Sequence, residues 1–370
     1  MTAETLTWIC IGVAASAFVF TLLNIIAFRP PPKCPDLRSL PPLSVLIPAR
    51  NEAGSIEHCL AALLESDHPD FEILVLDDNS EDATLRILAE IAALHPQVKP
   101  LAGSPLEPGW NGKQFACWQL AQSAKHEHFV FLDADVRLKP DALSAAHHLF
   151  LSQDIGLLSG FPRQITGTWM EKTLIPLVNF VLLGFLPFIM MRKTRIPGFS
   201  AGCGQFFMTS KSAYSKAGGH RAIQASAHDG VKLPRAYRAA GLSTDVCDFS
   251  THASVRMYHS TTQVWRGLMK NATEGIGAKP SILPMTFLLI FGQVLPWTLL
   301  WTGNPLITTP AAIAIFISYI TRLITTLPFG LSLTGALLHP IGVAFLVLIQ
   351  WWAWVEKLTG RKTTWKNRPV

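Results

Sequence analysis

The stretch Phe129-Val130-Phe131-Leu132-Asp133-Ala134-Asp135 determines how the rest of the sequence is interpreted. Its four consecutive apolar residues, aromatic and β-branched among them, are typical of a buried strand in a parallel sheet. In open α/β sheets, ligands bind beyond the carboxyl ends of the strands, where Asp133 and Asp135 would lie. Side chains two residues apart on an extended segment point the same way, so both carboxylates are expected to face one ligand. Such a pair suits a hard divalent cation, and a helix cap with a solvated turn is the structural alternative.

Strand-like and helix-like segments alternate on the N-terminal side of this stretch. Leu43 to Ile47 predicts a first strand that Pro48 ends, and Ile73 to Leu76 predicts a second strand. After each strand, apolar residues recur at helical spacing, and Ser80 is predicted to cap the second helix. This alternation predicts a doubly wound α/β sheet with helices on both faces.

The composition separates this chain from ordinary soluble proteins. Of its 370 residues, 49% are hydrophobic and 15% are charged, whereas about a quarter of residues are charged in soluble domains. The net charge is +6, without a basic block or an aromatic–basic pattern that would indicate nucleic acid as a partner. A membrane protein gains such a charge from its cytoplasmic flanks. The six cysteines are scattered, without zinc-finger spacing, which fits a reducing compartment.

Apolar segments of membrane-spanning length lie toward both ends of the sequence. Thr7 to Phe28 is long enough to span a bilayer as a helix, and it lacks the positively charged start of a signal peptide. The basic residues after it, beginning with Arg29, predict that the following domain lies in the cytoplasm. Three further candidates for spanning follow the central domain: Leu283–Trp301, Leu306–Ile320 and Leu331–Trp354.

The basic C-terminal tail conflicts with three crossings after the central domain. Three crossings would place residues 357–370, with their five Lys and Arg residues, outside the cytoplasm, against the positive-inside tendency. Either one segment does not cross or the tail breaks the rule, and Leu306–Ile320 is the segment expected not to cross cleanly.

Another apolar stretch, Thr173 to Met191, is interrupted by prolines. It is interpreted as a helix on the membrane surface, with a buried core helix as the alternative.

Motifs in a fixed order surround the central stretch and give the clearest indication of function. They are LSVLIPARNE (43–52), ILVLDDNS (73–80), HD (228–229) and QVWR (263–266). Together with DAD at 133–135, they resemble the inverting, nucleotide-sugar-dependent glycosyltransferases of family 2, which have the GT-A fold. The segment GWNGK (109–113) resembles the membrane-bound lipid glycosyltransferases of hopanoid, carotenoid and ceramide pathways. The resemblance covers residues 43–271.

The resemblance implies an α/β fold of the GT-A (Rossmann-like) type, with a mixed sheet and with transmembrane helices at both ends. The expected parts are a transmembrane helix (1–30), a proline-rich linker (31–42), a GT-A domain (43–280), a C-terminal transmembrane region (281–356) and the basic tail (357–370). The membrane-surface helix near 173–191 would belong to the GT-A domain.

The resemblance also assigns a donor site at the carboxyl ends of the strands. Asp78 is expected to accept hydrogen bonds from the uracil or ribose of a nucleotide sugar, with a UDP-sugar as the expected donor. Pro48, Arg50 and Glu52 are expected to line the same pocket. A solvated turn with acidic residues at a helix start is the structural alternative.

The diphosphate of the donor is expected to meet charged residues from three motifs. Asp133 and Asp135 would hold Mg²⁺ or Mn²⁺, which stabilises charge on the leaving nucleoside diphosphate. Lys113 would add a point charge near the phosphates or the acceptor, or would simply be an exposed lysine at a helix start. Gln263 and Arg266 resemble a truncated Gln-x-x-Arg-Trp element, in which the arginine clamps the diphosphate.

Asp229 is the candidate base, because inversion requires a group that takes the proton of the attacking acceptor hydroxyl. Related enzymes often have Glu-Asp where this chain has His228-Asp229. A helix N-cap is the alternative role for Asp229. Asp245 and Asp248 are weaker candidates for the base. Gly202-Cys203-Gly204 is expected to form a loop of close approach near the acceptor, or a plain turn.

The sequence thus predicts a metal-dependent, inverting hexosyltransferase that is a multi-pass protein of the cell inner membrane, with its catalytic domain in the cytoplasm. It would move one sugar from a nucleotide sugar to a membrane lipid of hopanoid, carotenoid or other isoprenoid type. A processive polysaccharide synthase is one alternative, which the few C-terminal segments and the missing tryptophan after Arg266 disfavour. A membrane transporter or scaffold with an inert nucleotide-binding domain is the other. The spanning candidates lack Asp, Glu, Lys and Arg residues, with Arg322 only near an edge, and this lack disfavours it.

Overall fold

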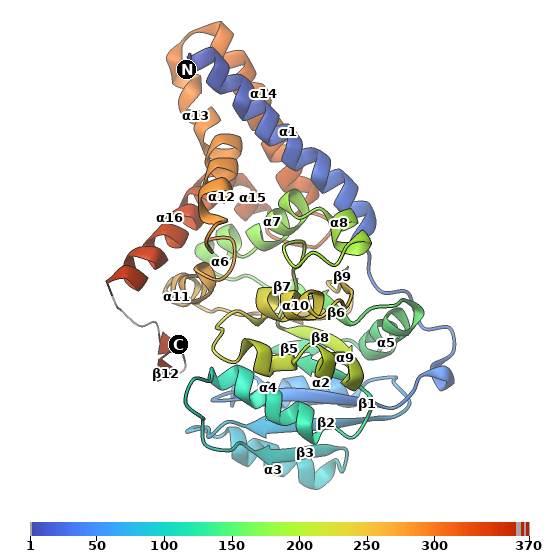
Figure 1. Cartoon of the computed structure of the whole chain (residues 1–370). Helices are drawn as coiled ribbons and strands as arrows, with labels where there is room; N and C mark the ends of the chain where they lie inside the picture. Colours follow the sequence, from blue (N-terminus) through green and yellow to red (C-terminus); the bar gives the residue numbers. More distant parts are fainter. Residues whose placement is uncertain (1, 360–363, 366–367, 370) are drawn as a thin grey trace.

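The structure, a computed structural model, describes residues 2–359, 364–365 and 368–369. A layered α/β domain forms one end of the molecule, and long apolar helices project from the other end (Figure 1). Three short helices lie between these two parts. They are α6 (Trp169–Leu174), α7 (Leu177–Phe185) and α8 (Phe188–Lys193).

The main sheet of the α/β domain is mixed, as predicted. In the described part of the chain it has seven strands in the order β3-β2-β1-β4-β8-β6-β9. The first four run parallel, whereas β8 is antiparallel to both β4 and β6. The strands are β1 (Leu43–Ala49), β2 (Phe71–Asp77), β3 (Val98–Ala102), β4 (His128–Leu132), β6 (Leu157–Phe161), β8 (Phe206–Ser210) and β9 (Thr244–Asp248). Smaller sheets are formed by β5 (Val136–Leu138), β7 (Arg163–Gln164) and β10 (Ala253–Val255), and by β11 (Thr364–Trp365) and β12 (Arg368–Pro369).

Helices cover both faces of the sheet, because alternate side chains of each strand point to opposite faces. On β4, Val130 and Leu132 belong to one apolar cluster, and Phe129 and Phe131 belong to another. The first cluster includes residues of α2 (Ile56–Leu64), α3 (Thr84–Leu94) and α5 (Ala142–Ser152). The second includes residues of α4 (Gly112–Ser123), α9 (Lys211–Lys216) and α10 (Asp229–Ala239). The α/β part of the described chain also has two 3₁₀ turns. η1 (Leu37–Ser39) precedes β1, and η2 (Gly219–Ile223) packs with the second cluster through Ile223.

Two local predictions about the first strands are wrong. Pro48 does not end β1, which continues to Ala49 in register with β2. The pairing with β4 stops at Leu46, so the missing N–H of Pro48 removes no hydrogen bond on that side. Ser80 does not cap α3, which begins at Thr84. Its hydroxyl instead accepts a hydrogen bond from the Asn51 N–H (3.0 Å) and so joins the loops after β1 and β2.

The apolar stretch from Thr173 to Met191 forms separate helices because prolines interrupt it. Pro176 lies between α6 and α7, and Pro187 lies between α7 and α8. The carboxylate of Glu171 anchors α6 to the α/β domain. It is buried, and it accepts hydrogen bonds from the Gly167 N–H (2.8 Å) and from the Arg256 guanidinium (3.1 Å).

In the described residues, four helical segments are long and apolar enough to cross a membrane: Ala3–Ala27, Ile282–Thr302, Pro305–Ile324 and His339–Leu358. The first, third and fourth are α1, α14 and α16. The second combines α12 (Ile282–Leu289), the π-helical turn η3 (Ile290–Val294), α13 (Leu295–Leu299) and η4 (Leu300–Thr302). Two shorter helices complete this part of the chain, α11 (Thr261–Ala272) before α12 and α15 (Leu333–Leu337) before α16. The small residues Ala14, Ala311 and Ala314 are buried between α1 and α14, which therefore pack closely.

A chain of three histidines under the sheet makes the stability of the fold depend on pH. His147 on α5 is hydrogen-bonded to His68 (2.9 Å) and to His128 (3.0 Å). Burial lowers the pKa of His68 to about 4 and that of His147 to about 3. Below the unfolded-state pKa, near 6.5, the unfolded chain binds protons that the folded chain excludes, so stability decreases as pH decreases.

We therefore expect the free energy of unfolding to decrease between pH 6.5 and pH 4. The decrease should be roughly 3 kcal/mol for a single histidine whose pKa falls from 6.5 to about 4, as for His68. Thermal unfolding of the detergent-solubilised protein at a series of pH values would measure the effect. A His147→Gln variant should show a shallower pH dependence than wild type. An equal dependence in both proteins would exclude the histidine chain as its cause.

Candidate active site

The predicted donor residues lie together where β1 and β2 end. Asp78 follows β2, and its N–H donates to the Ala49 carbonyl at the end of β1 (2.8 Å). Asn51 and Asn79 both adopt positive φ angles, 51° and 53°, which asparagine tolerates better than most residues. The two loops therefore turn sharply and form one buried edge of the sheet, as the motifs predict.

Arg50 ties the loop after β1 to the loop after β2. Its guanidinium donates to the carbonyls of Asp78 (2.6 Å) and Asn79 (2.9 Å) and pairs with Glu81 (3.2 Å). The Glu52 N–H donates to the Thr84 hydroxyl (2.8 Å), which ties the same loop to α3. These contacts hold the backbone of the Asp78 turn in a fixed shape.

Asp133 and Asp135 lie in a turn, so the extended geometry expected for them is wrong. β4 ends at Leu132, and the Val136 N–H donates back to the Asp133 carbonyl (3.1 Å). The negative charges of the two carboxylates nevertheless interact. Burial, Asp133 and Glu52 together raise the pKa of Asp135 to about 7. One carboxylate oxygen of Asp135 is buried and has no hydrogen-bond partner in the described part of the chain.

These observations fit a cation better than a helix cap. Buried carboxylates that repel one another are stabilised when a divalent cation binds between them. Among the described residues, however, no group of three or more His, Cys, Asp or Glu side chains is arranged to hold a metal ion. Asp133 and Asp135 would therefore supply only part of a coordination shell, which fits a cation that also binds substrate phosphates and water.

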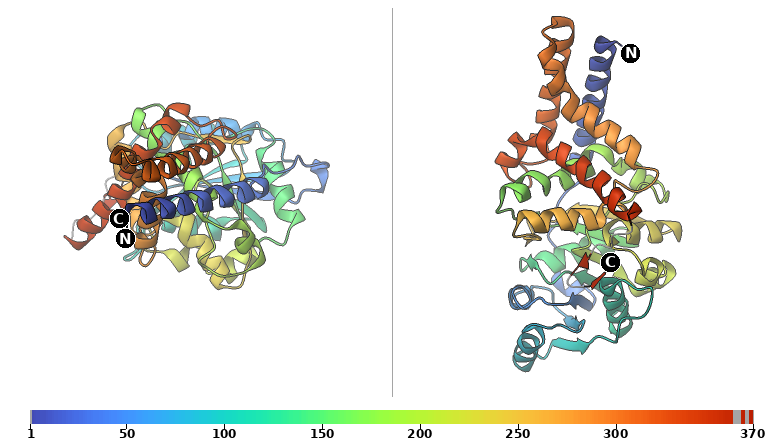
Figure 2. Two further views of the ribbon diagram at one scale, coloured as in Figure 1. Left: turned by 90° about the horizontal axis from the view of Figure 1, so that it is seen from above. Right: turned by 90° about the vertical axis from the view of Figure 1, so that its left-hand side faces the viewer.

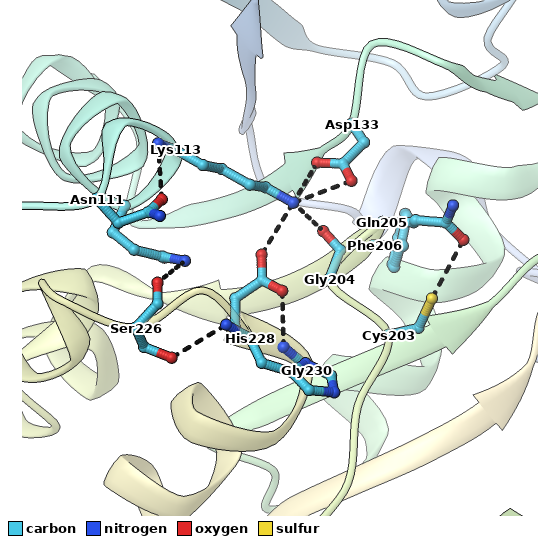
Figure 3. Close-up of polar contacts among 12 residues, drawn as sticks. Asn111, Lys113, Asp133, Cys203, Gly204, Gln205, Phe206, Ser226, His228 and Gly230 are labelled. Carbon is cyan, nitrogen blue, oxygen red and sulfur yellow. Dashed lines mark hydrogen bonds and ion pairs between the residues drawn. The ribbon is translucent and has the colours of Figure 1, made fainter. Parts of the chain in front are cut away.

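Lys113 lies at the centre of the site and connects the metal motif to the predicted base (Figure 3). Asn111 caps α4 by accepting the Lys113 N–H (3.1 Å). The Lys113 ammonium is 2.7 Å from Oδ1 of Asp133 and 2.9 Å from Oδ2 of Asp229. It also donates to the Gly204 carbonyl (3.3 Å). The ammonium thus neutralises two carboxylates that come from different parts of the fold, the turn after β4 and the start of α10.

The charges of this trio set the protonation state of each member. Burial alone would lower the pKa of Lys113, but Asp133 and Asp229 raise it well above its ordinary value. Burial alone would raise the pKa of Asp229, but the charge and hydrogen bond of Lys113 hold it well below its usual range. Lys113 is therefore a cation and Asp229 an anion at neutral pH, and the exposed-lysine alternative is excluded.

Asp229 is fixed at the start of α10. His228 occupies the N-cap position, and Asp229 is the first helical residue, so Asp229 is not the cap. Its Oδ1 accepts the Gly230 N–H (2.7 Å), and its Oδ2 is left to pair with Lys113. Glu274 holds the preceding loop by accepting hydrogen bonds from the Ser226 hydroxyl and the Ala227 N–H. The base candidate thus sits on a rigid helix end.

Gly204 approaches Asp229 so closely that any side chain there would overlap the carboxylate. We expect Gly204→Ala to displace Asp229 and to lower activity by on the order of 10²-fold, because a shift of about 1 Å in a reacting group has that effect. Gly198→Ala is the matched control, since a Cβ at Gly198 would meet no atom within 4 Å. Comparing turnover of both variants with wild type checks this prediction. Equal turnover would show that the close approach is not needed for catalysis.

The QVWR motif (263–266) lies on α11, and its members differ in their surroundings. Ser260 and Gln263 cap the helix. The Ser260 hydroxyl accepts the Gln263 N–H (3.2 Å), and Oε1 of Gln263 accepts the His259 N–H (2.7 Å). Arg266 is exposed. Lys270, one turn later, interacts electrostatically with Asp133 and Asp229, and burial and Lys113 lower its pKa to about 8.

Lys270 is the residue that sequence reasoning missed. Lys270 is four residues after Arg266, which places both on one side of α11. This helical spacing is the sequence feature that could have predicted its place near the site.

The weaker base candidates have other partners. Asp245 pairs with Arg192 (3.0 Å), and Asp248 accepts the Ser250 N–H (2.9 Å).

Comparison with known proteins identifies the family. The sequence model of glycosyl transferase family 21 matches residues 7–370. The chain belongs to this family. The resemblance to GT-A glycosyltransferases is therefore confirmed.

A curated relative and a solved structure extend this result. The chain is 29% identical over 258 residues to a 4,4'-diaponeurosporenoate glycosyltransferase of Staphylococcus aureus (strain USA300), over 68% of this chain and 66% of the relative. The match thus spans slightly less than two thirds of that relative. The fold is similar to that of mannosyltransferase PcManGT from Pyrobaculum calidifontis in complex with GDP-Man and Mn²⁺. That structure has a TM-score of 0.55 and 18% identity, over 96% of this chain and 100% of the other. This likeness confirms the fold.

Proposed function

We propose that this family 21 glycosyltransferase moves one sugar from a nucleotide-sugar donor to a membrane lipid, with inversion at the anomeric carbon. The observation that carries the proposal is the contact of Lys113 with both Asp133 and Asp229. This contact brings the turn after β4 next to the carboxylate at the start of α10. A donor phosphate and an acceptor hydroxyl would meet at this junction.

Asp229 is the proposed base. Its carboxylate is anionic, held by a helix end, and 13% exposed, so an acceptor hydroxyl can reach it. It would take the proton of that hydroxyl as the bond to the anomeric carbon forms, opposite the leaving group. Lys113 would balance the charge of Asp229 before the donor binds and would meet the diphosphate when it is bound.

The donor would lie along the edge formed by Asp78, Arg50, Glu52 and Asp133. Asp78 would face the nucleoside, in the turn that Arg50 fixes, with Pro48 below it. Asp133 and Asp135 would hold Mn²⁺ or Mg²⁺, which would supply charge stabilisation for the leaving diphosphate. Lys270 and Arg266, on the same helix as Gln263, would add positive charge around the phosphates. The Mn²⁺ and GDP-Man of the mannosyltransferase complex support a metal and a nucleotide sugar as ligands.

The acceptor would come from the membrane. Four apolar segments associate the chain with a membrane, and the name of the relative indicates a carotenoid-type lipid. We place the catalytic domain in the cytoplasm, next to the bacterial inner membrane, because basic residues follow α1. Nucleotide sugars are available on that side.

Mass spectrometry of lipids extracted from cells with and without this protein tests the proposal. A carotenoid-type or other isoprenoid lipid should gain the mass of one hexose residue only in cells that contain the protein. Loss of this residue in mild alkali indicates a glycosyl ester, and its retention indicates a glycoside. Identical lipid profiles in the two cell types would contradict the proposal.

A further inference from the structure

We propose that α16 does not cross the bilayer but lies along the membrane surface on the side of the catalytic domain. Its outer face would contact lipid headgroups. That this side is the cytoplasmic one rests on the proposed function. By length and composition α16 is a spanning candidate like α1 and α14. Its contacts, however, distinguish it from them.

The segment that precedes α16 returns to the α/β domain. Arg322, near the end of α14, is fully buried and donates to the Pro176 carbonyl between α6 and α7 (2.8 Å). The Phe329 ring packs on Phe28, at the end of α1, with centroids 5.6 Å apart. A Cβ at Gly330 would lie 3.1 Å from the Arg163 side chain of β7. The chain is therefore back at the level of the α/β domain before α16 begins.

The far end of α16 also contacts the catalytic side. The Trp354 indole N–H donates to the Gly277 carbonyl (2.7 Å), in the loop between α11 and α12. In between, a Cβ at Gly342 would lie 3.0 Å from the Thr173 carbonyl on α6. Figures 1 and 2 show the same arrangement. α1, α12–α13 and α14 rise away from the domain, whereas α16 runs back toward α11.

A spanning helix cannot make these contacts. A helix of 20 residues is about 30 Å long, which is about the thickness of the hydrocarbon core. If α16 crossed, its two ends would lie on opposite faces of the membrane. Gly342, near the start of α16, contacts α6, and Trp354, near its end, contacts the loop between α11 and α12, so the helix as a whole lies on one face.

The surface of α16 suits a membrane interface. Large apolar residues are exposed along α16 at helical spacing: Ile341, Leu348, Trp351, Trp352, Val355 and Leu358. At its C-terminal end, the ammonium groups of Lys279 and Lys357 lie 4.9 and 5.2 Å from the Trp354 ring. Tryptophan and lysine together are typical of the headgroup level, where the basic residues meet anionic lipids. The exposed Trp169 of α6 packs on Phe345 and extends the apolar face.

This arrangement removes the conflict between the basic tail and the positive-inside tendency. α1, α12–α13 and α14 would cross, and α16 would stay on the cytoplasmic side. The tail from residue 357 onward, with its five Lys and Arg residues, would then remain in the cytoplasm. The segment expected from the sequence not to cross, Leu306–Ile320, would be a crossing helix.

Labelling of single added cysteines in the full-length protein tests the path of the chain. Thr302→Cys reports on the tip between α13 and α14, Thr359→Cys on the end of α16, and Gln122→Cys on the catalytic domain. With a membrane-impermeant maleimide and intact cells, only Thr302→Cys should be labelled above the wild-type background. With inside-out vesicles, Gln122→Cys and Thr359→Cys should be labelled. Labelling of Thr359→Cys together with Thr302→Cys would overturn the inference.

The reversed pattern, with Gln122→Cys and Thr359→Cys labelled in intact cells, would contradict the cytoplasmic placement instead. It would still show that α16 does not cross, so the two failures are distinguishable. A depth measurement provides an independent check. Spin labels at Leu348 on α16 and at Phe316 on α14 both replace exposed mid-helix residues.

In vesicles that contain phosphatidylglycerol, the label at Leu348 should lie about 5–10 Å below the headgroups. The label at Phe316 should lie near the bilayer centre, about 15 Å deep. Equal depths at the two positions would overturn the inference.

Discussion

Replacing Asp229 with asparagine is expected to lower sugar transfer by about 10²–10⁴-fold, the usual contribution of a positioned base. Asparagine keeps the size of the side chain and can still accept the Gly230 N–H through its carbonyl oxygen. It cannot take a proton from the acceptor. Donor affinity should change little, and turnover with labelled donor at saturating lipid, beside calorimetric donor binding, measures both quantities.

Two controls make the Asp229 result specific. Asp229→Glu should recover only part of the activity, because it moves the carboxylate by about 1 Å. Asp248→Asn is the matched control, since Asp248 is also buried and also accepts one backbone N–H (2.9 Å). Near-normal turnover in Asp229→Asn, with a large loss in Asp248→Asn, would move the base to Asp248.

Removal of divalent cations is expected to abolish transfer, and Mn²⁺ or Mg²⁺ should restore it. Asp135→Ala should lose most of its turnover while the protein still folds, because burial already disfavours a charge at this position. Manganese binding, followed by the EPR signal of free Mn²⁺ in the presence of nucleoside diphosphate, should weaken in the same variant. Full activity in EDTA would exclude the metal assignment.

The fold was largely predictable because its main signals are local. Buried parallel strands need continuous apolar runs, and β1, β2 and β4 each supply one that ends in polar residues. The edge of the sheet where Asp78 and Asp133 lie follows from that pattern alone. The limits of the elements were less predictable, since Pro48 is tolerated only where the neighbouring strand has ended.

The site itself depends on contacts between distant residues, which the sequence does not encode locally. Lys113, Asp133 and Asp229 are separated by many residues and meet only in the folded chain. The turn at Asp133 and the closeness of Gly204 to Asp229 also arise from packing. Similarly, hydropathy makes both α14 and α16 candidates for spanning, and contacts such as those of Trp354 and Gly342 distinguish α16.

Transfer of labelled sugar by the purified protein in lipid nanodiscs tests the central claim most directly. The assay supplies a labelled nucleotide sugar, Mn²⁺ and an isoprenoid lipid acceptor, with Asp229→Asn as the reference. We expect label in an organic-extractable product that carries one sugar, formed by wild type and reduced by at least about 10²-fold in Asp229→Asn. Label that appears only as free sugar or in a water-soluble polymer, or equally with both proteins, would contradict the account.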